Sequence, residues 1–326
     1  MKRFFQSEVG AVLLWVAASL VLAAVIAPWL YQVGKGFAFL AKDLGFTGVC
    51  GWFGEACQQA EFSRYYNRSL LLAAVLLLPI LLKRHRQLCQ AGTRILPNER
   101  LYSRVTGVFQ CLLGLLLAGS VGWGLGALVD GLGAFTCTAT TPTTGQWLTQ
   151  ALIPALVVSG VEEWLFRGLL LGLWLRVARP ATACIGTSLV FAFVHFLAPM
   201  SETDVVDPTS AVAGLHHLWS ILLHFAEPRF LAADFLTLFT VGWILAMARL
   251  RTQRLWLSIG LHSGWVIAFK IYNLTHLKVL DCPVSAWWIG GSLRSGLLPL
   301  IALGLTAGLC HLVFKTIGYQ SKVNPV

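Results

Sequence analysis

VVSGVEEWLFRGLLLGLWL, residues 157–175, places three charged side chains in a run that otherwise consists mainly of apolar residues and glycine. The charged residues are Glu162, Glu163 and Arg167. A single charge at the centre of a membrane helix costs roughly 2.5 to 3.5 kcal/mol on insertion scales. Three charges within two helical turns therefore need a compensating role, which is either mutual pairing or chemistry.

The composition of the whole chain is that of a membrane protein. Of its 326 residues 57% are hydrophobic and only 12% are charged, and the mean hydropathy is +0.73. A soluble domain could not solvate so apolar a surface, which excludes the soluble classes. Because apolar runs recur from end to end with short polar gaps, we expect one membrane domain over residues 1–326.

The apolar runs predict an all-α, polytopic bundle of about eight transmembrane helices enclosing a polar intramembrane cavity. Each run is long enough, at about 1.5 Å per residue and with some tilt, to cross about 30 Å of hydrocarbon. We divide the domain into N-terminal helices within 1–129, a central part over about 147–271 and a C-terminal helix over 296–314. The predicted segments are 9–30, 67–82, 105–129, 147–175, 181–199, 231–248, 255–271 and 296–314.

The basic residues indicate the orientation in the membrane. The formal net charge is +10, and Lys and Arg cluster at the ends of apolar runs rather than along one face. With alternate crossings, about twice as many of them fall on the side of the N-terminus as on the other side. This positive-inside pattern predicts cytoplasmic termini and membrane lipids, not nucleic acid, as partners.

The same topology places four cysteines outside the cytoplasm: Cys50, Cys57, Cys137 and Cys282. In an oxidising compartment they can form two disulfides, with three possible connectivities, or they can remain free thiols.

Helix geometry separates the three charges at the centre of the chain. Glu163 and Arg167 are four residues apart in the favourable order of acid before base, so they can pair with one another. Glu162 points about 100° away and has no partner within its own turn. A lone carboxylate in a medium of low dielectric constant is a candidate general base or acid. The structural alternative is a hydrogen bond that only holds two helices together.

Two histidines favour the chemical interpretation. His195 follows Phe191 by four residues in FAFVHF, and His262 lies in SIGLHSGWVIAF; each is the single titratable group in its apolar run. One membrane histidine is more often a bundle hydrogen bond, but two of them together with Glu162, on three segments, favour a site. Counting along the helices places Glu162 and His195 at matching depth and His262 several ångströms nearer the cytoplasmic end.

These residues resemble the CPBP (or ABI) family of intramembrane proteases, which includes the Ras-converting prenyl-protein endopeptidases. The family pattern is EExxxR, then FxxxH, then HxxxN or a variant. Residues 162–167 match the first motif, residues 191–195 the second and His262 the start of the third. The departure is Val266, which stands where the family has a polar residue.

The resemblance implies an intramembrane endopeptidase whose substrate is a peptide or protein. Glu162 would activate a water, His195 would assist it, and His262 would stabilise the oxyanion or hold the water. Glu163 and Arg167, with Phe191, would support the site. Valine cannot donate a hydrogen bond, so the resemblance leaves the oxyanion position at Val266 in doubt. Glu162, His195 and His262 can also be read as a zinc set, which leaves a divalent metal open.

Two other functions remain as alternatives. A proton-coupled transporter could use Glu162 and the histidines as a relay, although no paired repeats are visible in the sequence. A catalytically inactive relative, suggested by Val266, could act as a scaffold or an immunity protein.

Overall fold

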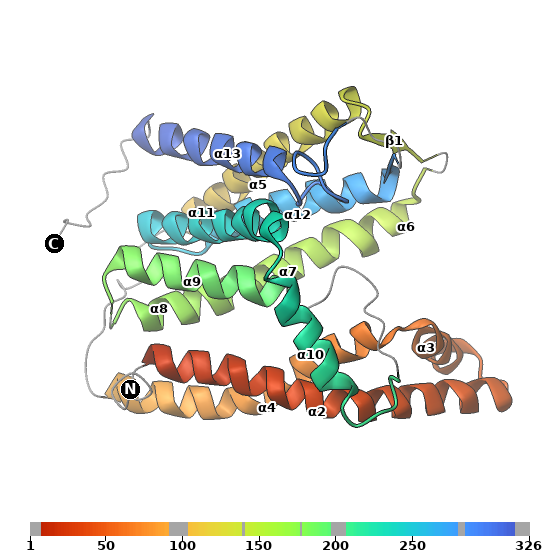
Figure 1. The fold of residues 1–326 in the computed structure, drawn as a ribbon. Coiled ribbons are helices and arrows are strands. Elements are labelled where there is room, and N and C mark those ends of the chain that lie inside the picture. Colours follow the sequence, from red (N-terminus) through yellow and green to blue (C-terminus); the bar gives the residue numbers. More distant parts are fainter. Residues whose placement is uncertain are drawn as a thin grey trace. The chain divides into compact units, whose positions relative to one another are not determined.

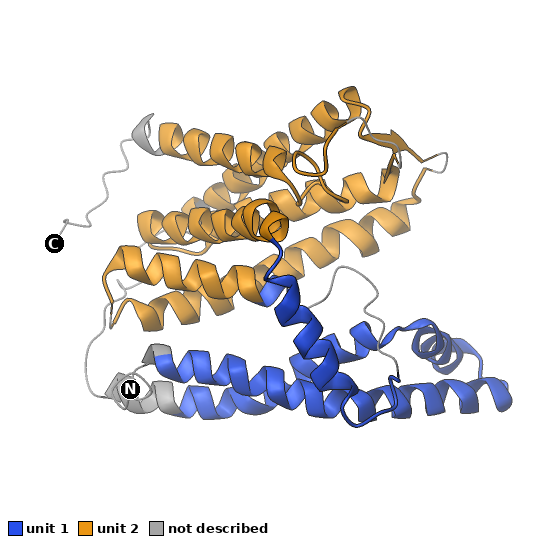
Figure 2. Ribbon diagram, viewed as in Figure 1, with its two compact units in different colours: residues 1–93, 194–227 blue, residues 94–193, 228–326 orange. Residues whose placement is uncertain are grey.

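The computed structural model describes residues 8–90, 104–138, 141–176, 178–196, 207–279 and 284–316, and these are almost entirely helical (Figure 1). The chain divides into two compact units (Figure 2). Unit 1 consists of residues 1–93 and 194–227, and unit 2 of residues 94–193 and 228–326. The single membrane domain over 1–326 stays a prediction.

Unit 1 is built on two long antiparallel helices joined through a short one. The helices are α2 (Glu8–Asp43), α3 (Gly48–Gln59) and α4 (Phe62–Gln90). Near the start of α2 the Trp15 indole donates to the carbonyl oxygen of Ala74 on α4 at 3.2 Å. Near its end Lys35 Nζ donates to the carbonyl oxygen of Ala60 at 3.0 Å, so the two long helices are antiparallel. The helix α2 ends at Asp43, well beyond the predicted end at residue 30, and contains Pro28.

A fourth helix of unit 1, α10 (Ala213–His224), packs on α2 at very close range. A Cβ atom at Gly214 would overlap the backbone of Ala24, so glycine is required for this approach. One turn later, the fully buried His217 ring packs against the rings of Phe62 and Tyr66, with centroids 5.6 and 4.7 Å apart.

Unit 2 contains the residues predicted to form the site, except His195, which the division assigns to unit 1. Its elements, in chain order, are α5 (Arg104–Gly131), β1 (Phe135–Cys137), α6 (Thr144–Gln146), η2 (Trp147–Leu152), α7 (Ile153–Glu163), η3 (Trp164–Leu170), α8 (Leu171–Trp174), most of α9 (Pro180–His195), η4 (Phe230–Phe235), α11 (Leu236–Thr252), α12 (Trp256–Thr275), β2 (His276–Lys278) and α13 (Leu297–Thr316). The three η elements are π-helical.

The central pair of unit 2 is α5 with α12, which run parallel. A Cβ atom at Gly260 would overlap the carbonyl oxygen of Cys111, one at Gly264 would crowd Ala118, and one at Gly122 would crowd Ala268. Contacts thus advance along both helices in the same direction. Small residues at these positions let the two backbones approach closely, as in membrane helix pairs of the GxxxG type.

A continuous helical run, 144–174, crosses unit 2 and carries the charged stretch. It begins with a capping box, in which Thr143 and Gln146 satisfy each other's backbone N–H groups. The π segment η3 starts immediately after Glu163. Single π segments inside α-helices occur frequently at functional sites.

A two-stranded sheet joins the C-terminal ends of α5 and α12. The strands β1 and β2 are antiparallel, with Phe135 opposite Lys278 and Cys137 opposite His276. The sequence pattern did not predict this sheet, because three-residue strands are too short to show an alternation of apolar and polar residues.

The predicted apolar segments fall on helices wherever the structure describes them, and residues 197–199 of the fifth segment lie outside the described residues. Four helices of the described part are long and apolar enough to cross a membrane: Gly10–Asp43, Phe62–Lys83, Thr106–Gly131 and Phe230–Thr252. Pro180–His195 and Leu297–Val313 are shorter apolar helices. The fold is all-α and typical of a membrane protein, while the eight crossings and the orientation of the termini stay predictions.

The predicted polar cavity also stays a prediction. A groove that the structure does show lies between α5 and α12 and is mainly apolar, with Leu116, Trp123 and Ile267 among its lining residues.

The predicted outside cysteines are free thiols as far as the structure describes them. Cys50, Cys57 and Cys137 form no disulfide, and Cys282 lies outside the described residues. A bridge between Cys50 and Cys57 is excluded, because seven residues of one helix separate them by about 10 Å, and disulfide geometry requires Cα atoms within about 7 Å.

Candidate active site

A buried ion pair lies at the junction of α7 and η3. Arg167 Nη1 donates to Glu163 Oε1 at 2.7 Å, and both side chains are completely buried. This is the predicted pairing of residues four apart on one helix face. A buried ion pair is retained only where good geometry and further hydrogen bonds offset the desolvation of both charges.

Arg167 has those further contacts on neighbouring helices. Its Nη2 donates to the carbonyl oxygen of Gly242 on α11 at 3.2 Å. Its guanidinium lies over the Phe191 ring of α9, 4.3 Å from the centroid, which is a cation–π geometry. Gly242 has no side chain, and a Cβ atom there would press on Ser188 and Phe191. Arg167 therefore joins η3, α9 and α11.

His262 is brought to the same place by the rotation of α12. It lies two residues from both Gly260 and Gly264, so it points away from the face that packs on α5. Its Nδ1 lies 2.9 Å from Glu163 Oε1, and its ring lies 6.0 Å from that of Phe191, edge to face. The His262 residue is 5% exposed.

The contact with Glu163 fixes the tautomer of His262. A carboxylate that already accepts from Arg167 can only accept again, so the Nδ1 proton of His262 must be the donor. The neutral ring then presents the lone pair of Nε2. That nitrogen lies 3.8 Å from Glu162 Oε2, and the Glu162 side chain is 24% exposed. The two neighbouring carboxylates thus lie on the two nitrogens of one imidazole.

The structure adds two details to the sequence predictions. Glu163 pairs with Arg167 as predicted and also contacts His262. His262, predicted several ångströms nearer the cytoplasmic end, lies 3.8 Å from Glu162 and 2.9 Å from Glu163.

The remaining predicted residues lie within one turn of this cluster along their own helices. His195 is the half-buried last residue of α9, four residues after Phe191 on the same face. Val266 is half-buried, four residues after His262 on the same face of α12. The carbonyl of Gly242 could not have been found from the sequence, since every residue carries one.

The possible zinc set is Glu162, His195 and His262. Glu163 Oε1 accepts from Arg167 and lies on His262 Nδ1, so Nε2 is the nitrogen of His262 that faces Glu162. Among the described residues, no group of three His, Cys, Asp or Glu side chains is arranged to hold a metal ion. A divalent metal at these residues stays a prediction.

Comparison with known proteins supports the family resemblance. Residues 144–268 match the family model described as type II CAAX prenyl endopeptidase Rce1-like, and this segment includes every residue of the cluster. Searches of curated proteins and of solved structures gave no significant match. The match confirms the resemblance inferred from the three motifs: residues 144–268 of this chain are similar to the Rce1-like group of the CPBP family.

Proposed function

We propose that the protein is an intramembrane endopeptidase in which Glu162 activates a water for attack on a peptide carbonyl. The observation that carries the proposal is the arrangement of two carboxylates on one imidazole, with His262 Nδ1 held by Glu163 and Nε2 facing Glu162. The Rce1-like match over 144–268 supports a peptidase and, with it, a peptide or protein substrate.

The 3.8 Å between Glu162 Oε2 and His262 Nε2 is too long for a direct hydrogen bond but suits a bridging water. Such a water donates one hydrogen to each acceptor, which leaves a lone pair on its oxygen for the carbonyl carbon. Glu162 takes the proton as the C–O bond forms, and it returns that proton to the leaving amine when the C–N bond breaks.

In this proposal His262 holds and orients the water, and Glu163 with Arg167 orients His262. For His195, one turn after Phe191 on α9, the assisting role rests on the family resemblance alone. Val266 donates no hydrogen bond, so the oxyanion is stabilised by a group other than the residue at that position. The proposed steps are written with side chains and a water alone.

The test is cleavage by the purified chain in lipid vesicles, offered a farnesylated CaaX peptide and a library of membrane peptides. We expect Glu162→Gln and His262→Gln to lower kcat by at least about a hundredfold, the usual loss when a general base is removed. Glu227→Gln is the control, because Glu227 is an exposed glutamate on the loop after α10, paired with His224. Cleavage by wild type and by the control alone supports the proposal. Equal cleavage by all four proteins, or by none, refutes it, and absence of cleavage by the wild type favours the inactive-relative alternative.

A further inference from the structure

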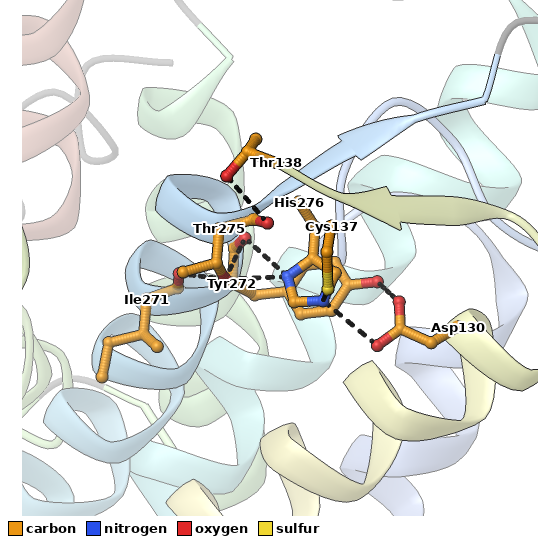
Figure 3. Close-up of polar contacts among 7 residues, drawn as sticks. All are labelled: Asp130, Cys137, Thr138, Ile271, Tyr272, Thr275 and His276. Atoms are coloured by element: carbon orange, nitrogen blue, oxygen red, sulfur yellow. Dashed lines mark hydrogen bonds and ion pairs between the residues drawn. The ribbon is translucent and has the colours of Figure 1, made fainter. Parts of the chain in front are cut away.

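A second cluster of reactive side chains lies at the sheet that joins the ends of α5 and α12 (Figure 3). Cys137 on β1 is exposed, and its Sγ lies 3.2 Å from His276 Nε2 on β2. The same nitrogen lies 3.3 Å from Asp130 Oδ2, at the end of α5. A thiol, an imidazole and a carboxylate within hydrogen-bond reach of one another have the composition of a base-assisted nucleophile.

The partners of the other ring nitrogen fix the tautomer of His276. Its Nδ1 lies 2.8 Å from Thr275 Oγ1 and 3.3 Å from the Tyr272 carbonyl oxygen. The Thr275 hydroxyl proton is directed to the carbonyl oxygens of Ile271 and Tyr272, so Oγ1 accepts from His276. Because a carbonyl oxygen can only accept, these contacts are satisfied by a proton on Nδ1. In that tautomer the lone pair of Nε2 faces the Cys137 thiol, whereas the Asp130 carboxylate, which also only accepts, is satisfied once Nε2 has taken a proton.

Asp130 favours transfer of the thiol proton. Its carboxylate faces the lone pair of Nε2, which is repulsive while the ring is neutral and attractive once the ring carries a second proton. Asp130 is itself held in place, because the Tyr272 hydroxyl donates to its Oδ1 and the Tyr272 ring stacks on His276 with centroids 4.1 Å apart. The carboxylate thus stabilises the imidazolium that forms, rather than the resting ring.

We propose that Cys137 is a nucleophilic thiol and a site of oxidation by hydrogen peroxide, with His276 as its base and Asp130 as the positioning residue. The sulfur attacks one peroxide oxygen as His276 Nε2 takes the thiol proton. The S–O bond forms, the O–O bond breaks, and the leaving hydroxide recovers the proton from Nε2 as water. Sulfur is oxidised to a sulfenic acid, and the peroxide is reduced. This site is separate from the Glu162–His262 cluster, and its test is independent of peptide cleavage.

The experiment measures the rate of sulfenic acid formation at each cysteine of the purified full chain. Hydrogen peroxide is added at a limiting dose, the product is trapped with a dimedone probe, and labelled peptides are quantified by mass spectrometry. Cys50 is an internal reference, because it is also exposed but lies on α3. We expect Cys137 to react at least about tenfold faster than Cys50, at the low end of the gain from a general base.

Two variants isolate the cause. His276→Gln removes the base and should bring Cys137 down to the rate of Cys50. Asp130→Asn keeps an acceptor for Tyr272 and should give an intermediate rate. His224→Gln, at a histidine on α10, is the matched control and should change neither rate. A tryptophan fluorescence spectrum and a melting temperature equal to those of the wild type show that each variant is folded. Equal rates at Cys137 and Cys50 in the wild type, or an undiminished excess in His276→Gln, would overturn the proposal.

Discussion

The same substitution at the two adjacent glutamates should change the stability by very different amounts. Glu163→Gln removes the carboxylate paired with the buried Arg167 guanidinium, although the bond of Arg167 to Gly242 and its contact with Phe191 persist. Removing one partner of a buried pair typically costs about 3–5 kcal/mol, and we expect a loss of that size in the free energy of unfolding. Glu162→Gln, at a side chain that is 24% exposed and 3.8 Å from His262, should cost less than about 1.5 kcal/mol.

Unfolding in mixed micelles with increasing SDS, followed through the 13 tryptophans, measures this difference. Peptide cleavage is measured on the same samples. We expect Glu162→Gln to be stable and inactive, and Glu163→Gln to be destabilised and impaired. The double variant Glu163→Gln/Arg167→Met removes both charges and should regain most of the stability, but not the activity, because His262 still lacks its anionic partner. Equal destabilisation by Glu162→Gln and Glu163→Gln, or a Glu163→Gln protein as stable as wild type, would refute this reasoning.

Three further predictions concern other parts of the chain. Gly260→Ala should lower the free energy of unfolding by about 1–3 kcal/mol or more, because the added Cβ meets the Cys111 carbonyl. The Cβ added by Gly124→Ala on α5 meets no atom within 4 Å, so this variant should be neutral or mildly stabilised. Unfolding in SDS compares the two variants. Val266→Asn, which restores the family's polar residue, should keep or raise peptide cleavage, and a complete loss would mean that Val266 shapes the pocket. Burial lowers the pKa of His217 from 6.5 to about 4. Between these pH values the unfolded chain binds more protons than the folded chain, so the free energy of unfolding falls as the pH is lowered. We expect a loss of about 1–2 kcal/mol between pH 7 and pH 5. The melting temperature of wild type should therefore drop over this range, while that of His217→Phe should not.

The sequence predicted the membrane class and the members of the cluster because both depend on local chemistry. Charges in an apolar run need partners, and four-residue spacing on one helix shows that Glu163 and Arg167 can pair. Likewise, solitary histidines in apolar runs are rare enough to mark His262 and His195 as candidates. None of this requires knowledge of how the helices pack.

The partner of His262 could not be predicted, because it depends on the rotation of α12. That rotation is set by the close approach of Gly260 and Gly264 to α5, which turns His262 toward α7. The GxxxG spacing in SIGLHSG was the available signal, since two glycines four residues apart in an apolar helix indicate a packing face. The cluster of Cys137 with His276 had no such signal, because its members are far apart in the sequence and meet through two short strands.

Both clusters of unit 2 use a histidine in the same way. At His262 and at His276, Nδ1 faces an oxygen that can accept its proton in a hydrogen bond, while Nε2 faces the group proposed to react. Fourteen residues, or about 20 Å of helix rise, separate the two rings, so their direct electrostatic coupling is weak in ordinary salt. Each cluster is therefore set by its own neighbours: at His262 by Glu163, which Arg167 also contacts, and at His276 by the oxygens of Thr275 and Tyr272 on one nitrogen and by Asp130 on the other. Charges stand out in the apolar run VVSGVEEWLFRG, whereas the polar residues around His276 lie at helix ends and on short strands, where such residues are common.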